Sequence, residues 1–478
     1  IRVSGCVRCF APMWSMPQGR RRLGGAVAMI SKLPVIPCKT WPLPLAASLT
    51  LGAGEARANA GLLIDRVEVD VVRAADLLRR GMDGDALWKA VQGLVERGDA
   101  AVVGGYYCAA ERGGQARLDC GHEFMYPTEW DPAEMPQKLA GPIGPGVNLK
   151  TNATPTAFER RTIGADMLWN HNRLVGKPYL ESELEFQQTR LLSMDEYGRG
   201  ANRQTMPRIA SQKLAKLSGQ LPFARRTLLA VHHDASASEQ MVFVFGRGQT
   251  QTAPLPVEEE VDPFAPGVDR DPDDTRLEVS VELIELSDQK FTELMRGAPQ
   301  IADWSRQRDR IGEMIEGDEA RLIASQHLAG RTGTKLAAGG AGEYFYPVSG
   351  DPPEISQHLA APGDQSPPIT AKAVMSHEKR QLGLSVEASP RFEAGLIDLQ
   401  IAIEYLALDR QIEFGDGKSA MQVPVFDAMR LTTSVKVGAG TDLLIGAFTP
   451  RAAETAEPVR DRRVLVFVRG SVAHSGAQ

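Results

Sequence analysis

The first 54 residues of this 478-residue chain contain no aspartate or glutamate. Residues 1–60 carry a net charge of +7, and the formal charge of the whole chain is −6, so the remainder carries −13. Affinity for nucleic acid depends on neutralising phosphates with basic side chains. An acidic body of this kind therefore argues against a nucleic-acid partner.

Long apolar runs are also missing. No run after the first 60 residues approaches the ~18 apolar residues of a membrane-spanning helix. The basic segment with Lys32 and Lys39 precedes the modestly apolar Trp41–Leu51, and Ala58-Asn59-Ala60 forms an A-x-A cleavage pattern. We expect residues 1–60 to be a leader segment in which translation starts at Met29 and an export signal ends at Ala60. An organellar transit peptide and a disordered basic arm are the alternatives.

Cysteine is scarce, with five in the chain and three of these in the leader. Cys108 and Cys120 remain, and they flank the turn at Gly113–Gln115 at equal spacing. In a hairpin they would face each other, and an exported protein can oxidise such a pair. Two small buried thiols are the alternative of similar weight.

Motifs that carry known chemistry are absent too, since neither H-E-x-x-H nor G-x-S-x-G occurs. Gly415–Ser419 ends like a phosphate loop, but Ile412 stands where the first glycine is needed, so we interpret it as a hairpin turn. His232-His233-Asp234 has no third His or Cys nearby and is interpreted as a polar loop. Glu181, Glu183 and Glu185 alternate along a strand and indicate a solvated face. We therefore expect a non-enzymatic protein without catalytic residues, cofactor or metal site.

A repeat is present instead. The stretch Gly113–Pro136 has a weaker second copy at Gly333–Ile355, in which Glu123–Pro127 aligns with Glu343–Pro347. Both copies contain a turn marked by glycine, an aromatic cluster that ends in Tyr-Pro, and an acidic loop with proline. The signature residues are Phe124, Tyr126, Pro127, Trp130 and Pro132 in the first copy and Tyr344, Tyr346 and Pro347 in the second. We expect Pro127 and Pro347 to end their strands, because proline cannot donate to a ladder.

Further segments match in the same order along the chain. The alternating runs Val67–Val72 and Leu277–Leu286 predict strands that precede helical segments. The helical segments are Ala74–Arg80 and Ala86–Arg97 in the first half and Ser287–Arg296 and Ile301–Ile315 in the second. Tyr179–Leu191 aligns with Leu396–Leu408, and apolar strands close both halves at Met241–Phe245 and Val464–Val468.

These matches predict an α+β fold made of two tandem repeats of a mainly antiparallel β-domain with short flanking helices. Its predicted parts are the leader 1–60, the first repeat 61–248, an acidic proline-rich linker 249–275, and the second repeat 276–473. The small drift in spacing between matched segments is typical of an old duplication.

The residues carry a resemblance to a known family. Gly114–Arg117 followed by Glu123–Pro132 resembles the GQ-A…YPTE-DP stretch of the bacterial secretins of type II and type III secretion. Pro155–Gly164 resembles the PTAFE-R-VG segment that follows it. Pro424–Phe426, Thr432–Val435 and Leu465–Val468 are similar to later strands of the same domain. The resemblance implies two tandem secretin-like domains, at about 67–248 and 277–473.

This resemblance also implies an exported protein of the periplasm or outer-membrane-associated envelope, with envelope protein partners and a possible homo-oligomer. Secretins are similar to one another in an amphipathic hairpin, rich in Leu, Gly and Pro, which precedes the last strand and inserts in the outer membrane. Here the corresponding intervals, His232–Gln240 and Thr449–Arg463, are polar and charged. A membrane-spanning strand needs an apolar outward face, so we expect no autonomous membrane insertion. The alternative is a soluble periplasmic scaffold or binding protein without a transport function.

Overall fold

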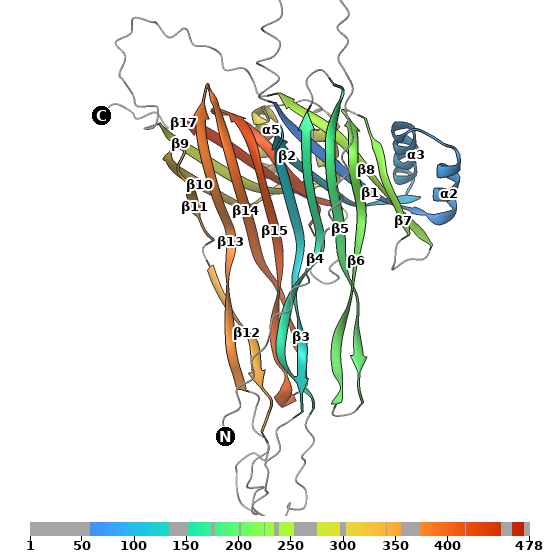
Figure 1. Cartoon of the computed structure of the whole chain (residues 1–478), viewed down its shortest axis with the longest axis vertical. Helices are drawn as coiled ribbons and strands as arrows, with labels where there is room; N and C mark the ends of the chain where they lie inside the picture. The colour runs from blue at the N-terminus through green and yellow to red at the C-terminus, as the bar shows by residue number, and fades with distance from the viewer. Residues whose placement is uncertain are drawn as a thin grey trace, which may run out of the picture. The chain divides into compact units, whose positions relative to one another are not determined.

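The computed structural model describes residues 58–132, 152–173, 177–199, 202–223, 225–233, 239–252, 275–296, 303–340, 342–354, 373–415, 417–450 and 461–472. All of them belong to one compact unit, Leu49–Gln478. Two antiparallel sheets dominate the described residues, and a few helices flank them (Figure 1). Residues 133–151, which follow Pro132, lie outside the described residues. Residues 253–274, which make up most of the predicted linker, do so as well.

The eight-stranded sheet has the order β10-β9-β17-β16-β2-β1-β8-β7. Its first-half strands are β1 (Ala58–Asp70), β2 (Ala100–Glu111), β7 (Thr227–His233) and β8 (Gln240–Thr252). Its second-half strands are β9 (Arg276–Ser287), β10 (Ala320–Arg331), β16 (Asp442–Phe448) and β17 (Arg462–Val472). The first half thus contributes the order β2-β1-β8-β7, and the second half contributes β10-β9-β17-β16. The halves repeat one pattern within a single continuous sheet.

The nine-stranded sheet has the order β11-β13-β14-β15-β3-β4-β5-β6, and β12 pairs with β13 and with β4. Its first-half strands are β3 (Gln115–Asp131), β4 (Thr154–Arg173), β5 (Tyr179–Tyr197) and β6 (Gln204–Pro222). Its second-half strands are β11 (Leu336–Ala338), β12 (Gly342–Asp351), β13 (Ala373–Glu393), β14 (Leu396–Phe414) and β15 (Met421–Gly438). Here too, each half contributes its strands in chain order.

Four α-helices flank the eight-stranded sheet: α2 (Val71–Arg79), α3 (Gly84–Glu96), α4 (Asp288–Arg296) and α5 (Ser305–Glu316). They correspond to the helical segments that the sequence predicts. The Asp70 carboxylate accepts hydrogen bonds from the N–H groups of Val72 and Arg73, and the Asp83 carboxylate accepts one from Ala86. Side-chain caps of this kind satisfy N–H groups that have no partner within the helix.

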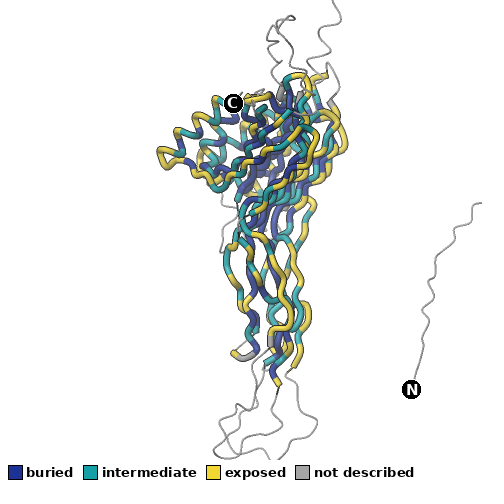
Figure 2. Tube along the Cα trace, turned by 90° about the vertical axis from the view of Figure 1, so that its left-hand side faces the viewer, coloured by how far each residue is buried: buried dark blue, intermediate teal, exposed yellow. Residues whose placement is uncertain are grey.

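The main core lies between the two sheets, where buried segments gather (Figure 2). Leu180, Leu184 and Phe186 of the alternating strand β5 are buried there, while Glu181, Glu183 and Glu185 between them are exposed. This alternation follows from the two-residue period of a strand. A second core contains Phe124, Tyr346, Val423, Val425 and Phe426. A third lies beneath α2 and α3.

The prediction that Pro127 and Pro347 end their strands is wrong. Strand β3 continues to Asp131, and β12 continues to Asp351. Each strand shifts its register just after the proline, between Pro127 and Glu129 in β3 and between Pro347 and Ser349 in β12. A proline lacks the N–H that the ladder needs, and a bulge lets the strand continue past it.

The assignment of residues 58–60 to the leader needs a correction as well. These residues belong to β1 and pair with both β2 and β8. Asn59 is buried, and its side chain makes two hydrogen bonds to the backbone of Lys436. A cleavage after Ala60 would remove these contacts from the folded chain. Removal of the leader stays a prediction, and residues 1–57 lie outside the described residues.

Candidate assembly site

The two halves join at corresponding strands in both sheets. In the eight-stranded sheet, β16 of the second half pairs with β2 of the first half, through Gly446–Phe448 and Tyr106–Cys108. In the nine-stranded sheet, β15 pairs with β3, through Val425–Thr433 and Ala116–Phe124. Strands β15 and β16 of the second half thus add to β3 and β2 of the first half. We call this pair of contacts the internal joint.

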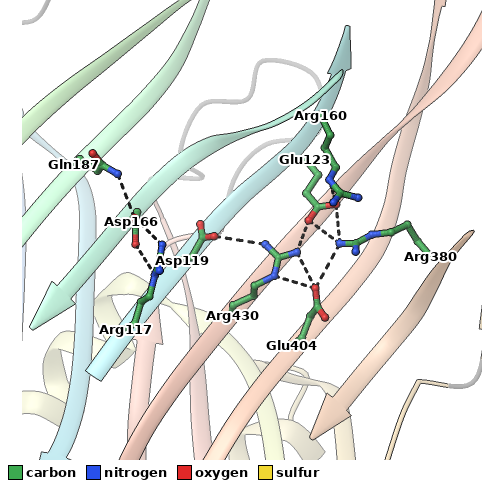
Figure 3. Close-up of polar contacts among 9 residues, drawn as sticks. All are labelled: Arg117, Asp119, Glu123, Arg160, Asp166, Gln187, Arg380, Glu404 and Arg430. Atoms are coloured by element: carbon green, nitrogen blue, oxygen red, sulfur yellow. Dashed lines mark hydrogen bonds and ion pairs between the residues drawn. The ribbon is translucent and has the colours of Figure 1, made fainter. Parts of the chain in front are cut away.

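A charge cluster stabilises the internal joint on β3 and β15 (Figure 3). Glu123 of β3 is buried, and its carboxylate accepts hydrogen bonds from the guanidinium groups of Arg430 on β15 and Arg380 on β13. Arg160 lies 3.7 Å from the same carboxylate. Glu404 of β14 accepts further hydrogen bonds from Arg430, at 2.7 and 2.9 Å.

The electrostatics of this cluster follow from burial and from opposite charge. Burial lowers the pKa of Arg430, but hydrogen bonds and charge interactions with Glu123 and Glu404 outweigh that effect and raise it. Arg430 therefore stays charged. Burial raises the pKa of the neighbouring Asp119, which lies 3.5 Å from Arg430. A charge buried with such partners is costly to leave unpaired, so the cluster favours this alignment of β3 and β15.

Each half also has an edge strand in each sheet, which pairs with another described strand on one side only. Among the described strands, β7 and β6 end one side of the two sheets, and β10 and β11 end the other. The edge strands β6 and β7 occupy the places in the first half that β15 and β16 occupy in the second. The edge strands β10 and β11 correspond to β2 and β3 in the same way. The open edges therefore correspond to the two surfaces that the internal joint brings together.

Exposed apolar side chains gather near both open edges. Leu192, Met194 and Tyr197 lie on β5 where it pairs with β6, and they are 39%, 37% and 56% exposed. At the opposite side, Phe345 on β12 and Met375 on β13 are 62% and 61% exposed. Large apolar side chains in groups at a sheet edge are typical of interaction sites.

The corresponding part of the second half is covered. Val423 and Phe426 of β15 are fully buried in the second core, where they pack with Phe124 of β3 and Tyr346 of β12. The residues that align with them on β6 are Met206 and Ile209, which are only half-buried. The hairpin of β5 and β6 thus lacks the cover that the first half gives to the hairpin of β14 and β15.

The structure brings several signature residues together. Phe124 and Tyr346 belong to the second core, and Tyr126, Trp130 and Tyr344 pack against it. The Tyr346 and Phe426 rings lie 5.6 Å apart in an edge-to-face contact. The Tyr346 hydroxyl donates to Glu378 at 2.9 Å, and burial together with this hydrogen bond raises the pKa of Tyr346 to about 12. Pro132, by contrast, is exposed at the end of its described segment.

Cys108 and Cys120 are buried, and no disulfide joins them. The expectation that they are cross-strand neighbours in a hairpin is wrong, because β2 and β3 belong to different sheets. Cys108 lies opposite Leu62 and Gly446, whereas Cys120 lies opposite Ala165 and Met429. The turn between them is present, with Gly113 at φ +72°, but the chain leaves one sheet and enters the other there. Burial raises the pKa of the Cys108 thiol.

Within the described ranges, no three His, Cys, Asp or Glu side chains gather as a metal site would require. His232 contacts the Leu214 carbonyl oxygen, and Asp234 lies outside the described residues. Gly417–Ser419 forms a short turn between β14 and β15, as the hairpin interpretation predicted. Among the described helices, none is both long and apolar enough to cross a membrane.

The sequence did not reveal the charge cluster. In the sequence, Glu123 is only the first residue of the repeated stretch Glu123–Pro127, and Glu343 occupies its place in the second copy. Its partners Arg380 and Arg430 are more than 250 residues away along the chain. A charged residue at an inward position of an alternating strand is the one signal that could have indicated it.

Comparisons with known proteins give distant similarities. No family model matches the chain, and no curated protein matches it. Among solved structures, it is similar to the Klebsiella pneumoniae type II secretion outer membrane complex of PulD, PulS and the PulC HR domain, at 10% identity and a TM-score of 0.23. That similarity covers 52% of this chain and 46% of the other.

The E. coli K12 type II secretin GspD is similar at 9% identity and a TM-score of 0.21, covering 52% of this chain and 58% of that one. The Salmonella SPI-1 type III injectisome secretin InvG is similar at 10% identity and a TM-score of 0.24, covering 61% and 88%. This chain therefore spans about half the length of the first two proteins that it matches. Similarities this distant leave its family membership and its function to be proposed.

Proposed function

We propose that this chain is a secretin-like, non-enzymatic component of a bacterial envelope, and that it acts in secretion or envelope assembly as a head-to-tail homo-oligomer. The observation that carries the proposal is the internal joint, in which β15 and β16 of one half add to β3 and β2 of the other. The envelope role rests on the resemblance of Glu123–Pro132 to the secretins.

Head-to-tail assembly follows from the two open edges. A heterologous contact joins two different surfaces of the same molecule, so each added copy presents the same free surfaces again. Here β6 and β7 of one copy would pair with β11 and β10 of the next, as β15 and β16 pair with β3 and β2 within the chain. Exposed edge strands that carry apolar side chains are otherwise a liability for aggregation. One copy on each side covers both edges.

A role without a membrane pore of its own is favoured by the two polar intervals before the closing strands. Between them, His232–Gln240 and Thr449–Arg463 contain one valine and no leucine, isoleucine or phenylalanine. Arg or Lys on a lipid-facing strand costs about 2–4 kcal/mol at the middle of the membrane. The same intervals favour the second candidate, a soluble periplasmic scaffold that retained the domain. Most of both intervals lies outside the described residues.

Fractionation followed by sizing tests the proposal. The full chain is expressed in a bacterial host, and envelope and soluble fractions are sized with and without detergent. We expect a large oligomer in the exported fraction, which stays large when detergent is absent. A monomer in the periplasmic fraction would reject assembly and favour the scaffold. Protein that remains in the cytoplasm would reject an envelope role.

A further inference from the structure

A cavity of about 340 Å³ lies on the helix-covered face of the eight-stranded sheet, between α3 of the first half and α4 of the second. Its apolar wall includes Trp88, Val91, Phe291 and Met295. Trp88 packs edge-to-face on Phe245, with the ring centroids 5.0 Å apart. The volume falls within the range of small-molecule sites, and the mostly apolar wall is typical of them.

Three arginines from the sheet side line this cavity, and two of them have carboxylate partners. Arg226 forms an ion pair with Asp65 and lies over the Trp88 ring at 4.4 Å. Arg463 is 1% exposed and lies 2.6 Å from Asp288. Both guanidinium groups are therefore neutralised by groups of the chain itself.

The third arginine, Arg247 of β8, differs. The Nε of its guanidinium group is buried and has no hydrogen-bond partner among the described atoms, and the side chain lines the cavity. Burial and the nearby charge of Arg226 lower the pKa of Arg247 to about 10. The Nε of Arg463 also lacks a hydrogen-bond partner among the described atoms. A buried donor without an acceptor is costly, and the cavity gives an acceptor access to Arg247.

In the second half, the arginine that corresponds to Arg247 is neutralised by a carboxylate. Arg247 lies opposite Leu63 of β1, and Arg469 lies opposite Ser280 of the corresponding strand β9. Asp442 at the start of β16 lies opposite Arg469 and binds it at 3.1 Å. In the first half, β7 starts at Thr227, which lies opposite Gly246 of β8. Because the two strands are antiparallel, Arg226, the residue before Thr227, lies opposite Arg247. The acidic partner of the second half is thus replaced by a second cation.

We propose that this cavity binds a small apolar monocarboxylate, with its carboxylate on the Arg247 guanidinium and its apolar body against Trp88, Val91 and Met295. The planar guanidinium fits a carboxylate through paired hydrogen bonds. The lining contains as many acidic as basic side chains. One negative charge is therefore accommodated, whereas a dianion such as phosphate would be repelled by Asp65 and Asp85.

The test uses the full chain and octanoate as the probe, with octanamide as its uncharged analogue and inorganic phosphate as the dianion. Isothermal titration calorimetry should show saturable binding of octanoate alone. Arg247→Gln should weaken it at least tenfold, since hydrogen bonds to charged groups contribute that much. Thr292→Trp, which fills the cavity from α4 without touching Arg247, should weaken it by a similar factor.

Arg469→Gln is the matched control, because it changes the corresponding arginine of the second half and should leave octanoate binding unchanged. Thermal unfolding of each variant verifies that it is folded. Binding that Arg247→Gln leaves intact, equal binding of octanamide, preferred binding of phosphate, or no binding to the unmodified chain would each overturn the proposal.

Discussion

Glu123 of the first half and Arg430 of the second half form an ion pair across β3 and β15, where the two halves join in one sheet. Glu123 is almost fully buried, and Arg380 approaches the same carboxylate at 2.7 Å. Two arginines therefore share one buried acid, and both also contact Glu404.

We predict that Glu123→Gln lowers the free energy of unfolding by about 3 kcal/mol, because it removes the buried carboxylate and leaves Arg380 and Arg430 with the more exposed Glu404 as their shared partner. Glu343→Gln is the matched control. Glu343 occupies the corresponding place in the second copy, but it and its partner Lys379 are both 48% exposed. That pair should contribute less than about 1 kcal/mol. Urea unfolding of the full chain measures both, and equal effects would contradict the role given to Glu123.

A second prediction concerns the contact between the two sheets at Asn59. Its Nδ2 donates to the Lys436 carbonyl oxygen, and its Oδ1 accepts from the Lys436 N–H, both at 2.8 Å. Asn59→Ala should cost about 2 kcal/mol, because two backbone groups lose their partner. Asn172→Ala, on an exposed position of β4, should change stability by less than about 0.5 kcal/mol. If the two substitutions have equal effects in urea unfolding, the Asn59 contact does not stabilise the fold.

The third prediction is a pH dependence at His171. This side chain is buried beside Trp169, and burial lowers the pKa of His171 to about 4. Its hydrogen bond to the Ala110 carbonyl oxygen opposes that shift but does not outweigh it. The folded state thus disfavours the protonated form. In the unfolded chain the group takes up a proton near pH 6.5.

Stability linked to His171 is therefore present above pH 6.5 and is lost as the pH falls towards about 4. Between pH 7 and pH 4.5 the loss should be about 2–3 kcal/mol. His171→Gln should remove that part of the pH dependence while other groups still titrate. Urea unfolding at the two pH values measures it. The same pH dependence in the variant and in the unmodified chain would show that His171 does not contribute.

Local pattern was enough to predict much of the secondary structure. Alternation along Tyr179–Leu191 identified β5 and its exposed glutamates, and the apolar stripe of Ala86–Arg97 identified α3. Glycine at position 113 marked a real turn. These features depend on residues that are near each other in the sequence.

Long-range pairing could not be predicted in the same way. Nothing near Cys108 or Cys120 indicates that their strands belong to different sheets, because a turn with glycine serves a hairpin and a sheet crossing equally well. Likewise, Glu123 and Arg430 become neighbours only when β3 and β15 pair. The ordered matches indicated two repeats, but not that each sheet contains strands of both.

The central claim is that the open edges pair as the internal joint does. Arg117 of β3 lies opposite Thr432 of β15. The residue of β11 that corresponds to Arg117 is Ala337. Ala337 lies opposite Glu387, and Arg117 lies opposite Leu168, the residue that aligns with Glu387. The residue of β6 that corresponds to Thr432 is Lys216. Lys216 lies opposite Glu185, and Thr432 lies opposite Ala402, the residue that aligns with Glu185. Ala337 of one copy should therefore meet Lys216 of the next, and both are exposed.

The most direct measurement uses the full chain with Cys6, Cys9 and Cys38 replaced by serine and with Lys216→Cys and Ala337→Cys introduced together. This variant is oxidised, and its products are separated by non-reducing electrophoresis. We predict a ladder of dimers, trimers and larger species, because each copy then has one thiol at each end. Either single substitution, or Ala337→Cys combined with Val72→Cys on α2, should give no ladder. A double variant that stays monomeric, or that forms no more than its single-substitution controls, would contradict head-to-tail assembly.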